Sequence, residues 1–289
     1  MTLPFQALSC PLDALPLQRV DTCWRCTSGH SYDVSAQNYV NLLPVQHKRS
    51  RDPGDSKEMI AARHRFLQAG HYLPIAQAVC RAALDDQRAS TALRCLDAGC
   101  GEGYYLRTLL AAGERRQLPL QSIGLDISKW AVSAAAKRDR QTTWVVGTNA
   151  NLPVQPATLD LVLCMFGFPV YAEFARVLKP GGKLIQVDAG PDHLRELREI
   201  IYPSLRPGRE DARNIPTRFQ PTATESLRYQ MTVDSAETIA DLLVMTPHFY
   251  RAGAEGRARA AALKELTTTV DVVVTQFTLE PNGNDHERI

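Results

Sequence analysis

Short apolar segments alternate with amphipathic segments from residue 92 onward. The apolar segments predict strands at residues 92–97, 122–126, 142–147, 159–166 and 183–189. The segments between them predict helices at residues 104–112, 129–138 and 170–178. The fourth strand is continuously apolar, which is typical of a strand that is covered on both faces. Strands that alternate with helices at this spacing predict an α/β fold with a doubly wound, Rossmann-like parallel sheet.

Further elements are predicted on both sides of this region. Toward the end of the chain the pattern predicts a loop or cover region, a strand, a helix and a long β-rich run, at residues 203–224, 227–233, 236–244 and 267–279. Before the region, Ser56 is placed to cap a helix that Gly70 ends. Pro74 suits the first turn of a second helix. We expect the late strands to complete one side of the sheet.

Three parts of the chain differ in their patterning. Residues 1–45 lack helical periodicity and contain three of the seven cysteines. Residues 46–91 begin with a polar linker and hold the two predicted helices, and residues 46–72 carry six Lys and Arg against three acids. Residues 92–289 carry the strand–helix alternation. We therefore predict a small N-terminal segment, a basic linker with helices, and one α/β domain.

Composition excludes several classes of protein. Hydrophobic residues make up 44% of the 289 residues and charged residues 22%, which supports a sizeable core and excludes extensive disorder. The sequence contains no run of 18 apolar residues, so we expect no membrane span. The first residues do not resemble a secretory signal, and we expect a cytoplasmic protein. A net charge of +2 argues against nucleic-acid binding by the whole surface but permits a local basic patch.

A glycine-rich loop follows the first predicted strand. Residues 97–103 read Asp-Ala-Gly-Cys-Gly-Glu-Gly, and Asp126 ends the next strand, where a carboxylate can accept hydrogen bonds from both ribose hydroxyls. Glycine lets such a loop turn tightly and approach a ligand. A dinucleotide fingerprint needs glycine five positions after Gly99, and Tyr104 stands there. The loop, with Asp97 and Gly99, therefore favours S-adenosylmethionine (SAM), and a tight turn without a ligand is the alternative.

Three later segments agree with a SAM-dependent enzyme. Residues 151–153 read Asn-Leu-Pro after the third strand, where Leu152 would wall the adenine. Residues 179–182 read Lys-Pro-Gly-Gly, a turn that is typical of these folds. Residues 166–169 read Phe-Gly-Phe-Pro and follow the fourth strand. Because ligands bind outside the carboxyl ends of parallel strands, these aromatic rings would either stack on a flat substrate or cover the adenine.

The N-terminal segment contains a group of possible metal ligands. Cys10, Cys23, Cys26 and His30 fall within 21 residues, and Cys23 and Cys26 have C-x-x-C spacing. Zinc binds tetrahedrally to thiolate and imidazole ligands, and small segments with little core often depend on it. Asp13 is a fifth candidate ligand. The alternative is a degenerate zinc finger that no longer binds metal.

Several motifs carry a specific resemblance. The chain resembles the bacterial RlmA-type 23S rRNA (guanine-N1)-methyltransferases over nearly its whole length. The motifs recur in the same order: Tyr-Val-Asn-Leu-Leu-Pro-Val-Gln-His-Lys-Arg-Ser-Arg-Asp-Pro-Gly-Asp-Ser at 39–56, Gly-His-Tyr at 70–72, Gly-Cys-Gly-Glu-Gly-Tyr-Tyr at 99–105, Ala-Ala-Ala-Lys-Arg at 134–138, Lys-Pro-Gly-Gly at 179–182, Gly-Pro-Asp-His-Leu at 190–194 and Met-Thr-Pro at 245–247. The Phe-Gly-Phe-Pro at 166–169 differs from the Tyr-Ala-Pro-Cys of the family.

The resemblance implies a fold, an activity and a set of ligands. It implies a class I SAM-dependent methyltransferase domain behind a zinc-finger-like segment that recognises RNA. The reaction would be methylation of N1 of a guanine in hairpin 35 of 23S rRNA, free or in a precursor of the large subunit. The implied SAM contacts are Tyr72, Gly101, Glu102 and His193.

The resemblance also implies zinc at Cys10, Cys26 and His30. The fourth family ligand aligns with Asp13, so either Asp13 or Cys23 would complete the site. We prefer Cys23, because thiolate is the softer ligand. The sequence does not distinguish a monomer from a homodimer.

The residues can support this chemistry. N1 lies on the pairing edge of guanine, so the base must be unpaired or turned out of its stack, as in a hairpin loop. Lys48, Arg49 and Arg51 are placed to hold phosphates. N1 must also lose its proton, and Asp192, His193 and Glu102 are conceivable bases among which the sequence does not choose. The alternatives are a SAM-dependent methyltransferase of a small molecule or protein, and a non-catalytic RNA- or ribosome-binding module.

Overall fold

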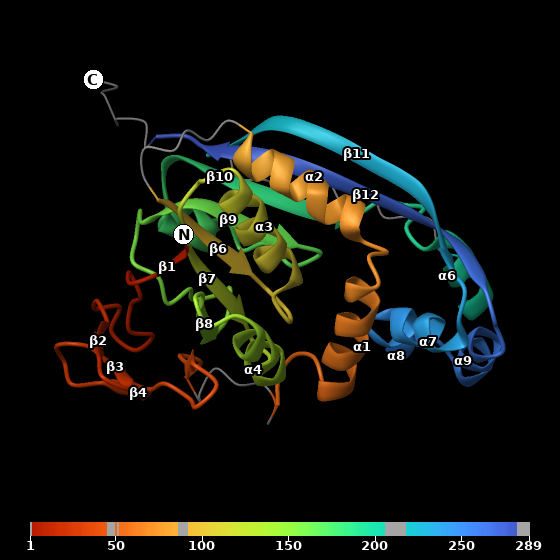
Figure 1. Cartoon of the computed structure of the whole chain (residues 1–289), viewed down its shortest axis with the longest axis horizontal. Coiled ribbons are helices and arrows are strands. Elements are labelled where there is room, and N and C mark those ends of the chain that lie inside the picture. The colour runs from red at the N-terminus through yellow and green to blue at the C-terminus, as the bar shows by residue number, and fades with distance from the viewer. Residues whose placement is uncertain (1, 45–49, 51, 86–91, 206–217, 282–289) are drawn as a thin grey trace, which may run out of the picture.

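A computed structural model describes residues 2–44, 50, 52–85, 92–205 and 218–281 of the chain. Its main sheet has nine strands in the order β11-β12-β10-β9-β6-β7-β8-β5, and β1 also pairs with β7 (Figure 1). These strands are β1 (Thr2–Pro4), β5 (Tyr39–Asn41), β6 (Leu93–Ala98), β7 (Leu120–Asp126), β8 (Thr143–Val146), β9 (Leu159–Met165), β10 (Leu178–Ala189), β11 (Phe219–Val233) and β12 (Leu266–Leu279).

The central strands confirm the predicted Rossmann-like sheet. β6 pairs in parallel with both β7 and β9, and β8 and β10 extend the parallel region on either side. β12 then pairs antiparallel with β10, and β11 antiparallel with β12, so the late strands complete one side as expected. Because the carboxyl ends of the parallel strands meet at one edge, the loops after β6, β7, β8 and β9 lie together there.

Helices cover both faces of this sheet. They are α1 (Lys57–Gln68), α2 (Leu73–Leu84), α3 (Tyr104–Arg115), α4 (Lys129–Arg138), α5 (Tyr171–Val177), α6 (Arg195–Ile201), α7 (Ala236–Val244), α8 (His248–Arg251) and α9 (Ala254–Ala261). Figure 1 shows α2 and α3 across one face and α7–α9 gathered beside α1. No helix among the described residues is long and apolar enough to cross a bilayer.

Two buried cores result from the alternation of side chains along each strand. On β9, for example, Leu161 and Leu163 face one core, whereas Val162 faces the other. The first core packs against α2, α3 and α4, and the second against α5 and the N-terminal segment. Successive side chains of a strand point to opposite faces, so the sheet holds the two cores apart.

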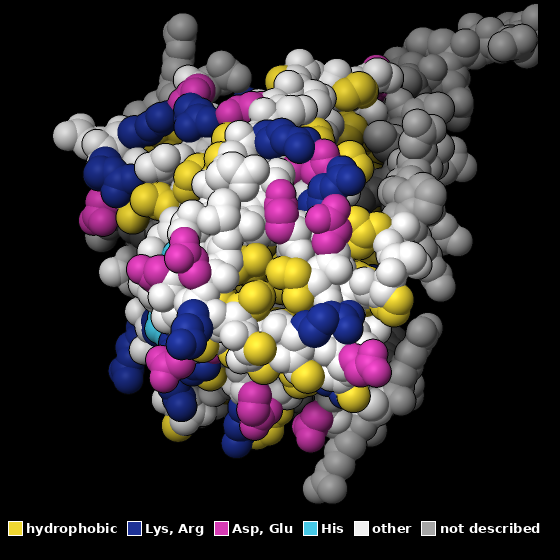
Figure 2. Space-filling model, turned by 90° about the vertical axis from the view of Figure 1, so that its right-hand side faces the viewer, with side chains coloured by type: hydrophobic (Ala, Val, Ile, Leu, Met, Phe, Trp, Pro, Cys, Tyr) yellow, Lys and Arg dark blue, Asp and Glu magenta, His cyan; other side chains and the backbone are white. Residues whose placement is uncertain are grey.

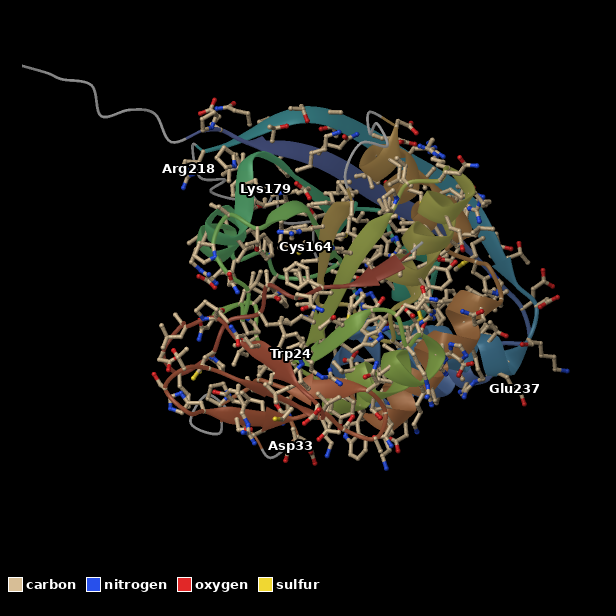
Figure 3. The ribbon with its side chains drawn as sticks, turned by 60° about the vertical axis from the view of Figure 1, so that its left-hand side comes forward. Trp24, Asp33, Cys164, Lys179, Arg218 and Glu237 are labelled. Atoms are coloured by element: carbon tan, nitrogen blue, oxygen red, sulfur yellow. The ribbon has the colours of Figure 1, made fainter. Side chains whose placement is uncertain are left out.

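The N-terminal segment contributes to two sheets. Its β2 (Gln18–Val20), β3 (Cys23–Arg25) and β4 (Ser31–Asp33) form a three-stranded antiparallel sheet. On either side of it in the chain, β1 joins the main sheet beside β7 and β5 joins it beside β8, both in parallel. Figure 3 shows Trp24 and Asp33 in the small sheet, alongside the main one. The division of the chain at residues 45 and 91 stays a prediction.

The pattern of residues misses some elements. The expected loop at 203–224 is wrong from Phe219 on, because β11 begins there. Nearly all side chains of β11 between Gln220 and Thr232 are exposed or half-buried, so this strand lacks the apolar alternation that marks a strand in a sequence. β1–β5, α6, α8 and α9 are absent from the predictions as well.

Surface charge is mixed on one large face. Figure 2 shows the right-hand side of Figure 1, where basic and acidic side chains are interspersed with hydrophobic ones. Among the described residues of that face, no large patch of a single sign is visible. This agrees with the small net charge of +2. A basic surface for nucleic acid must therefore be local.

Candidate cofactor site and metal centre

The loop after β6 has the shape of a ligand cradle. Gly99, Gly101 and Gly103 have φ angles of +94°, +55° and +81°, which favour glycine. A Cβ at Gly99 would meet no atom within 4 Å, so open space lies beside the backbone there. The amides of Gly99 and Cys100 both donate to the carbonyl oxygen of Leu125, at 2.8 and 2.9 Å. The loop is thus fixed against the end of β7 while one side stays open.

Asp126 is fixed at the end of β7 by two backbone amides. Its Oδ2 accepts a hydrogen bond from the Gly101 amide at 2.9 Å, and its Oδ1 accepts one from the Ser128 amide at 2.8 Å. Burial raises the pKa of the Asp126 carboxyl. Each carboxylate oxygen can accept more than one hydrogen bond. Asp126 is therefore oriented to accept two further donors, such as the hydroxyls of a ribose.

Asp97 presents an unsatisfied carboxyl at the start of the loop. Its side chain is 1% exposed, and neither carboxyl oxygen has a hydrogen-bond partner among the described residues. Burial, and secondly the charge of Asp126, raises the pKa of Asp97 to about 7. A buried carboxylate without a partner is costly, and a cationic group can supply the missing interaction. SAM carries both ribose hydroxyls and cationic groups, so the residues present fit it.

This pKa gives a pH-dependent prediction. In the folded, ligand-free protein Asp97 stays protonated up to a pH of about 7, whereas in the unfolded chain it ionises near its ordinary pKa of 3.8. The free energy of unfolding therefore falls as the pH rises through that range. A cationic ligand binds the ionised form, so SAM affinity should rise up to about tenfold per pH unit below pH 7 and level off above it. Calorimetry from pH 5.5 to 8 measures this. Asp97→Asn should bind weakly without that slope, and a wild-type affinity independent of pH would contradict the assignment.

Glu102 contacts the helices around the loop. Its carboxylate is buried between α1, α3 and α4, where Oε2 lies 3.0 Å from Arg107 Nη2, 3.2 Å from His64 Nδ1 and 3.8 Å from Arg138 Nε. Oε1 has no hydrogen-bond partner among the described residues. The expected contact between Glu102 and SAM stays a prediction. The observed contacts tie the loop to three helices.

Tyr72, Phe166 and His193 form an aromatic group at the same edge. Tyr72 precedes α2, Phe166 follows β9 with a φ of +52°, and the ring centroids of the three residues lie 5.9–6.3 Å apart. A Cβ on Gly167 would lie 3.8 Å from the carbonyl oxygen of Ala98, which joins this group to the glycine loop. The structure thus brings together Tyr72 and His193, which are far apart in the sequence.

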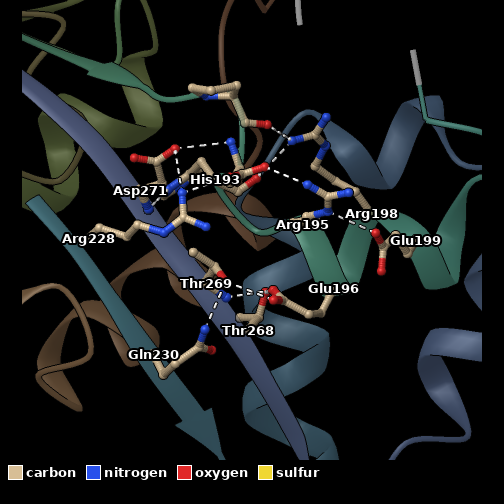
Figure 4. A network of polar contacts seen from close by, with 12 residues as sticks. His193, Arg195, Glu196, Arg198, Glu199, Arg228, Gln230, Thr268, Thr269 and Asp271 are labelled. Carbon is tan, nitrogen blue, oxygen red and sulfur yellow. Dashed lines mark hydrogen bonds and ion pairs between the residues drawn. The ribbon is translucent and has the colours of Figure 1, made fainter. Parts of the chain in front are cut away.

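His193 is held in one tautomer. The Asp271 amide on β12 donates to its Nδ1 at 3.3 Å (Figure 4), so the ring proton is on Nε2. This Nε2 lies 3.2 Å from the Tyr72 hydroxyl. Burial lowers the pKa of His193 to about 4. Neutral His193 therefore donates to Tyr72, and the hydroxyl hydrogen of Tyr72 is free to donate to a ligand.

The start of α6 is anchored to the same strand. Glu196 accepts hydrogen bonds from the Thr269 amide at 2.6 Å and from the Thr269 hydroxyl at 2.7 Å (Figure 4). This anchor lies three residues from His193 in the chain. It fixes the turn that carries the imidazole.

The loop after β8 adds one residue that the sequence patterns do not indicate. Leu152 is buried as expected, and its amide donates to Glu173 Oε2 at 2.7 Å. Asn149 lies closer to the glycine loop, because its Nδ2 is 3.5 Å from the carbonyl oxygen of Ala98. The buried Oδ1 of Asn149 has no hydrogen-bond partner among the described residues. Only its position after a parallel strand could have indicated this residue.

Four side chains of the N-terminal segment are arranged as a metal site. The ligand atoms of Cys10, Asp13, Cys26 and His30 all lie within 4.8 Å of one another. His30 Nδ1 lies 3.5 Å from Cys10 Sγ, 3.4 Å from Cys26 Sγ and 3.1 Å from Asp13 Oδ2. Two sulfurs, one imidazole nitrogen and one carboxylate oxygen fit tetrahedral zinc.

Cys23, the preferred fourth ligand, lies outside this group. It pairs with Val20 across the turn between β2 and β3, and its thiol donates to the Val20 carbonyl oxygen at 3.3 Å. Cys26 comes after β3, where the chain turns toward His30. The hairpin thus directs the two cysteines to different places. Of the two candidates, the geometry favours Asp13.

The predicted phosphate contacts Lys48, Arg49 and Arg51 lie outside the described residues. Their placement at the site is therefore a prediction from the sequence alone.

Comparison with known proteins agrees with both sites. Residues 8–51 match the family model described as RlmA, N-terminal, a zinc ribbon, and residues 96–186 match a methyltransferase domain. A Streptomyces fradiae protein named 23S rRNA (guanine(748)-N(1))-methyltransferase is 30% identical over 92% of this chain and 95% of its own length. A Bacillus subtilis protein named as a candidate 23S rRNA (guanine-N(1)-)-methyltransferase is 32% identical over 94% and 96%.

A solved structure, the YcgJ protein of Bacillus subtilis, is 17% identical over 72% of this chain and 98% of that chain, with a TM-score of 0.47. The sheet, the glycine loop and the matched models define a SAM-dependent methyltransferase with an N-terminal zinc ribbon. The chain belongs to the RlmA family of 23S rRNA (guanine-N1)-methyltransferases.

Proposed function

We propose that this protein transfers the methyl group of SAM to N1 of a guanine in hairpin 35 of 23S rRNA, in the cytoplasm. The observation that carries the proposal is family membership along almost the whole chain, zinc ribbon included. Methyltransferases with other names match a smaller part of the chain. The demethylmenaquinone methyltransferase of Thermotoga maritima, for example, is 31% identical over 37% of this chain. The ribbon therefore supports an RNA substrate over a small molecule.

The chain's own residues would bind and orient the cofactor. When bound, SAM supplies an electrophilic methyl group, so the protein contributes mainly position. Asp126 would hold the ribose, Asp97 a cationic group, and the Tyr72 hydroxyl a further acceptor of the ligand. Cys10, Asp13, Cys26 and His30 would hold zinc and so fix the ribbon.

The three conceivable bases are all engaged by other groups of the protein. His193 is neutral, but its Nδ1 already accepts from a backbone amide. Asp192 lies between Arg195 and Arg228, which lower its pKa. Glu102 is buried, and its Oε2 is paired with Arg107 and Arg138. We therefore propose that N1 loses its proton to solvent or to an RNA group while the protein orients the base.

The test is to delete the gene in its host and map 23S rRNA by reverse transcription. A methyl group on N1 blocks the pairing edge, so wild-type rRNA should give a stop at one guanine that the deletion strain lacks. Complementation with the wild-type gene should restore the stop, whereas Asp126→Ala should not. If the deletion strain keeps every stop within hairpin 35, the proposed substrate is wrong.

The basic linker gives a separate prediction. Changing Lys48, Arg49 and Arg51 to Ala together should weaken binding of a hairpin 35 RNA and lower the salt slope of its binding constant by about 2.1–2.7, because each of three phosphate contacts contributes roughly 0.7–0.9. Fluorescence anisotropy at several salt concentrations measures the slope. Exposed Lys264 serves as the control, since Lys264→Ala should leave the slope unchanged. An unaltered slope in the triple variant would refute a phosphate role.

A further inference from the structure

The ammonium groups of two lysines lie close to the indole ring of Trp130. It lies on the first turn of α4 and is half-buried, whereas the other two tryptophans, Trp24 and Trp144, are 4% and 1% exposed. Lys57 Nζ lies 4.0 Å from the ring centroid of Trp130, and Lys129 Nζ lies 6.0 Å from it. Both lysines are exposed. Two ammonium groups and one aromatic ring thus share a small area of the surface.

The contact between the first turns of α1 and α4 creates this cluster. Ser56 caps α1 and Ser128 caps α4, and the Ser128 hydroxyl donates to the Asp55 carbonyl oxygen at 2.7 Å. Gly54 lies so close that a Cβ there would be 2.9 Å from Ser128 Cβ. Since α4 begins three residues after Asp126, the cluster lies at the edge of the sheet that carries the cofactor loop.

The cluster has an excess of positive charge. Among the described residues, no carboxylate forms an ion pair with Lys57 or Lys129, and Asp55 is paired with Arg63 instead. Asp126 accepts two backbone amides, and exposed Glu58 is the acid that interacts electrostatically with Lys57.

Cations in the first turn of a helix are also unfavourable, because the amino end carries partial positive charge. α4 has a lysine and no acid there. Such local conflicts tend to mark functional positions.

We propose that Lys57, Lys129 and Trp130 bind the RNA beside the target guanine. The two lysines each contact a backbone phosphate, and the half-exposed indole offers a neighbouring unpaired base a surface for stacking. In the free protein the ammonium groups rest on the ring through cation–π contacts. A stacking base takes the place of Lys57 on the ring as that lysine moves to a phosphate. This inference rests on the proposed function and adds to it a second basic contact, separate from Lys48, Arg49 and Arg51 and next to the cofactor site.

The experiment uses the full-length protein and a synthetic RNA hairpin with the sequence of hairpin 35 from the host. Lys57→Ala with Lys129→Ala should weaken binding about tenfold near 0.1 M salt and lower the salt slope by about 1.4–1.8, that is, two phosphate contacts. Lys137→Ala is the matched control, because Lys137 is an exposed lysine on the last turn of the same helix. Calorimetry with SAM should give the wild-type affinity for all variants, which shows that they are folded.

Tryptophan fluorescence provides an independent readout. RNA should quench the emission of the wild-type protein, because Trp130 is the tryptophan that is not buried. Trp130→Phe should lose most of the quenching yet bind RNA within about threefold of wild type, whereas Trp130→Leu should bind distinctly more weakly, because only Phe preserves an aromatic surface.

Two results would overturn the cluster as an RNA contact: a wild-type salt slope in the double lysine variant, or an equal loss of slope in Lys137→Ala. Either result leaves the proposed function intact if the rRNA is still methylated. Conversely, the proposed function is wrong if no methylated guanine in hairpin 35 depends on this gene. Binding of the hairpin through Lys57, Lys129 and Trp130 can still be measured in that case.

Discussion

Asp126→Ala should weaken SAM binding at least about 100-fold. Two hydrogen bonds to a charged acceptor contribute on the order of 1.5–3 kcal/mol each, and both are lost with the carboxylate. The change also leaves the amides of Gly101 and Ser128 without their acceptor, which loosens the loop. Calorimetric titration with SAM measures the affinity, and methylation of 23S rRNA should fall in parallel.

Two further variants make this result specific. Asp126→Asn keeps one acceptor oxygen and should lose less affinity than the alanine variant. Asp85→Ala removes an exposed carboxylate that pairs with Arg116 beyond the end of α2, and it should leave SAM binding unchanged. If Asp126→Ala binds SAM like the wild-type protein, Asp126 does not hold the ribose and the site must be placed elsewhere on the edge of the sheet.

Cys26→Ser should remove the metal from the N-terminal ribbon. We expect about one zinc ion per wild-type chain by elemental analysis and close to none in the variant, because serine is a poor ligand for zinc. The ribbon has only short strands, so loss of the ion should expose residues 8–44 to proteolysis. SAM binding through Asp97 and Asp126 should survive.

Cys23→Ser is the matched control for this variant. It makes the same replacement of sulfur by oxygen three residues earlier in the chain. The Cys23 thiol, however, faces the Val20 carbonyl oxygen rather than the ligand group. The metal content should therefore stay at about one ion per chain. Loss of zinc from Cys23→Ser, together with its retention in Asp13→Ala, would show that Cys23 is the fourth ligand after all.

The sequence predicts the cofactor edge well, because the determinants are local. The five central strands follow from apolar runs, and the glycine loop is a contiguous motif at residues 97–103. Asp126 could be located because it ends the strand after that loop. Each of these inferences needs only the order of residues and the rule that parallel strands end at one edge.

Other features depend on contacts between distant residues. Tyr72 and His193 are 121 positions apart, and only the fold shows that their polar atoms meet. The choice between Asp13 and Cys23 depends on the direction of one hairpin, which the spacing of cysteines does not determine. β5 has three residues, too few for any periodicity to appear. The resemblance to a family indicated Tyr72 and His193 as SAM contacts, but it could not give the tautomer of His193.

The first strands of the chain lie within the main sheet, and this limits how the protein can be shortened. β1 pairs with β7, and β5 closes the sheet beyond β8. Removing residues 1–44 would expose the backbone amides and carbonyls of β8 along the new border, and such borders promote self-association. A trimmed enzyme that precipitates would therefore reveal nothing about RNA recognition by the ribbon. Single substitutions on the outer surface of the ribbon test whether it recognises RNA without disturbing its contribution to folding.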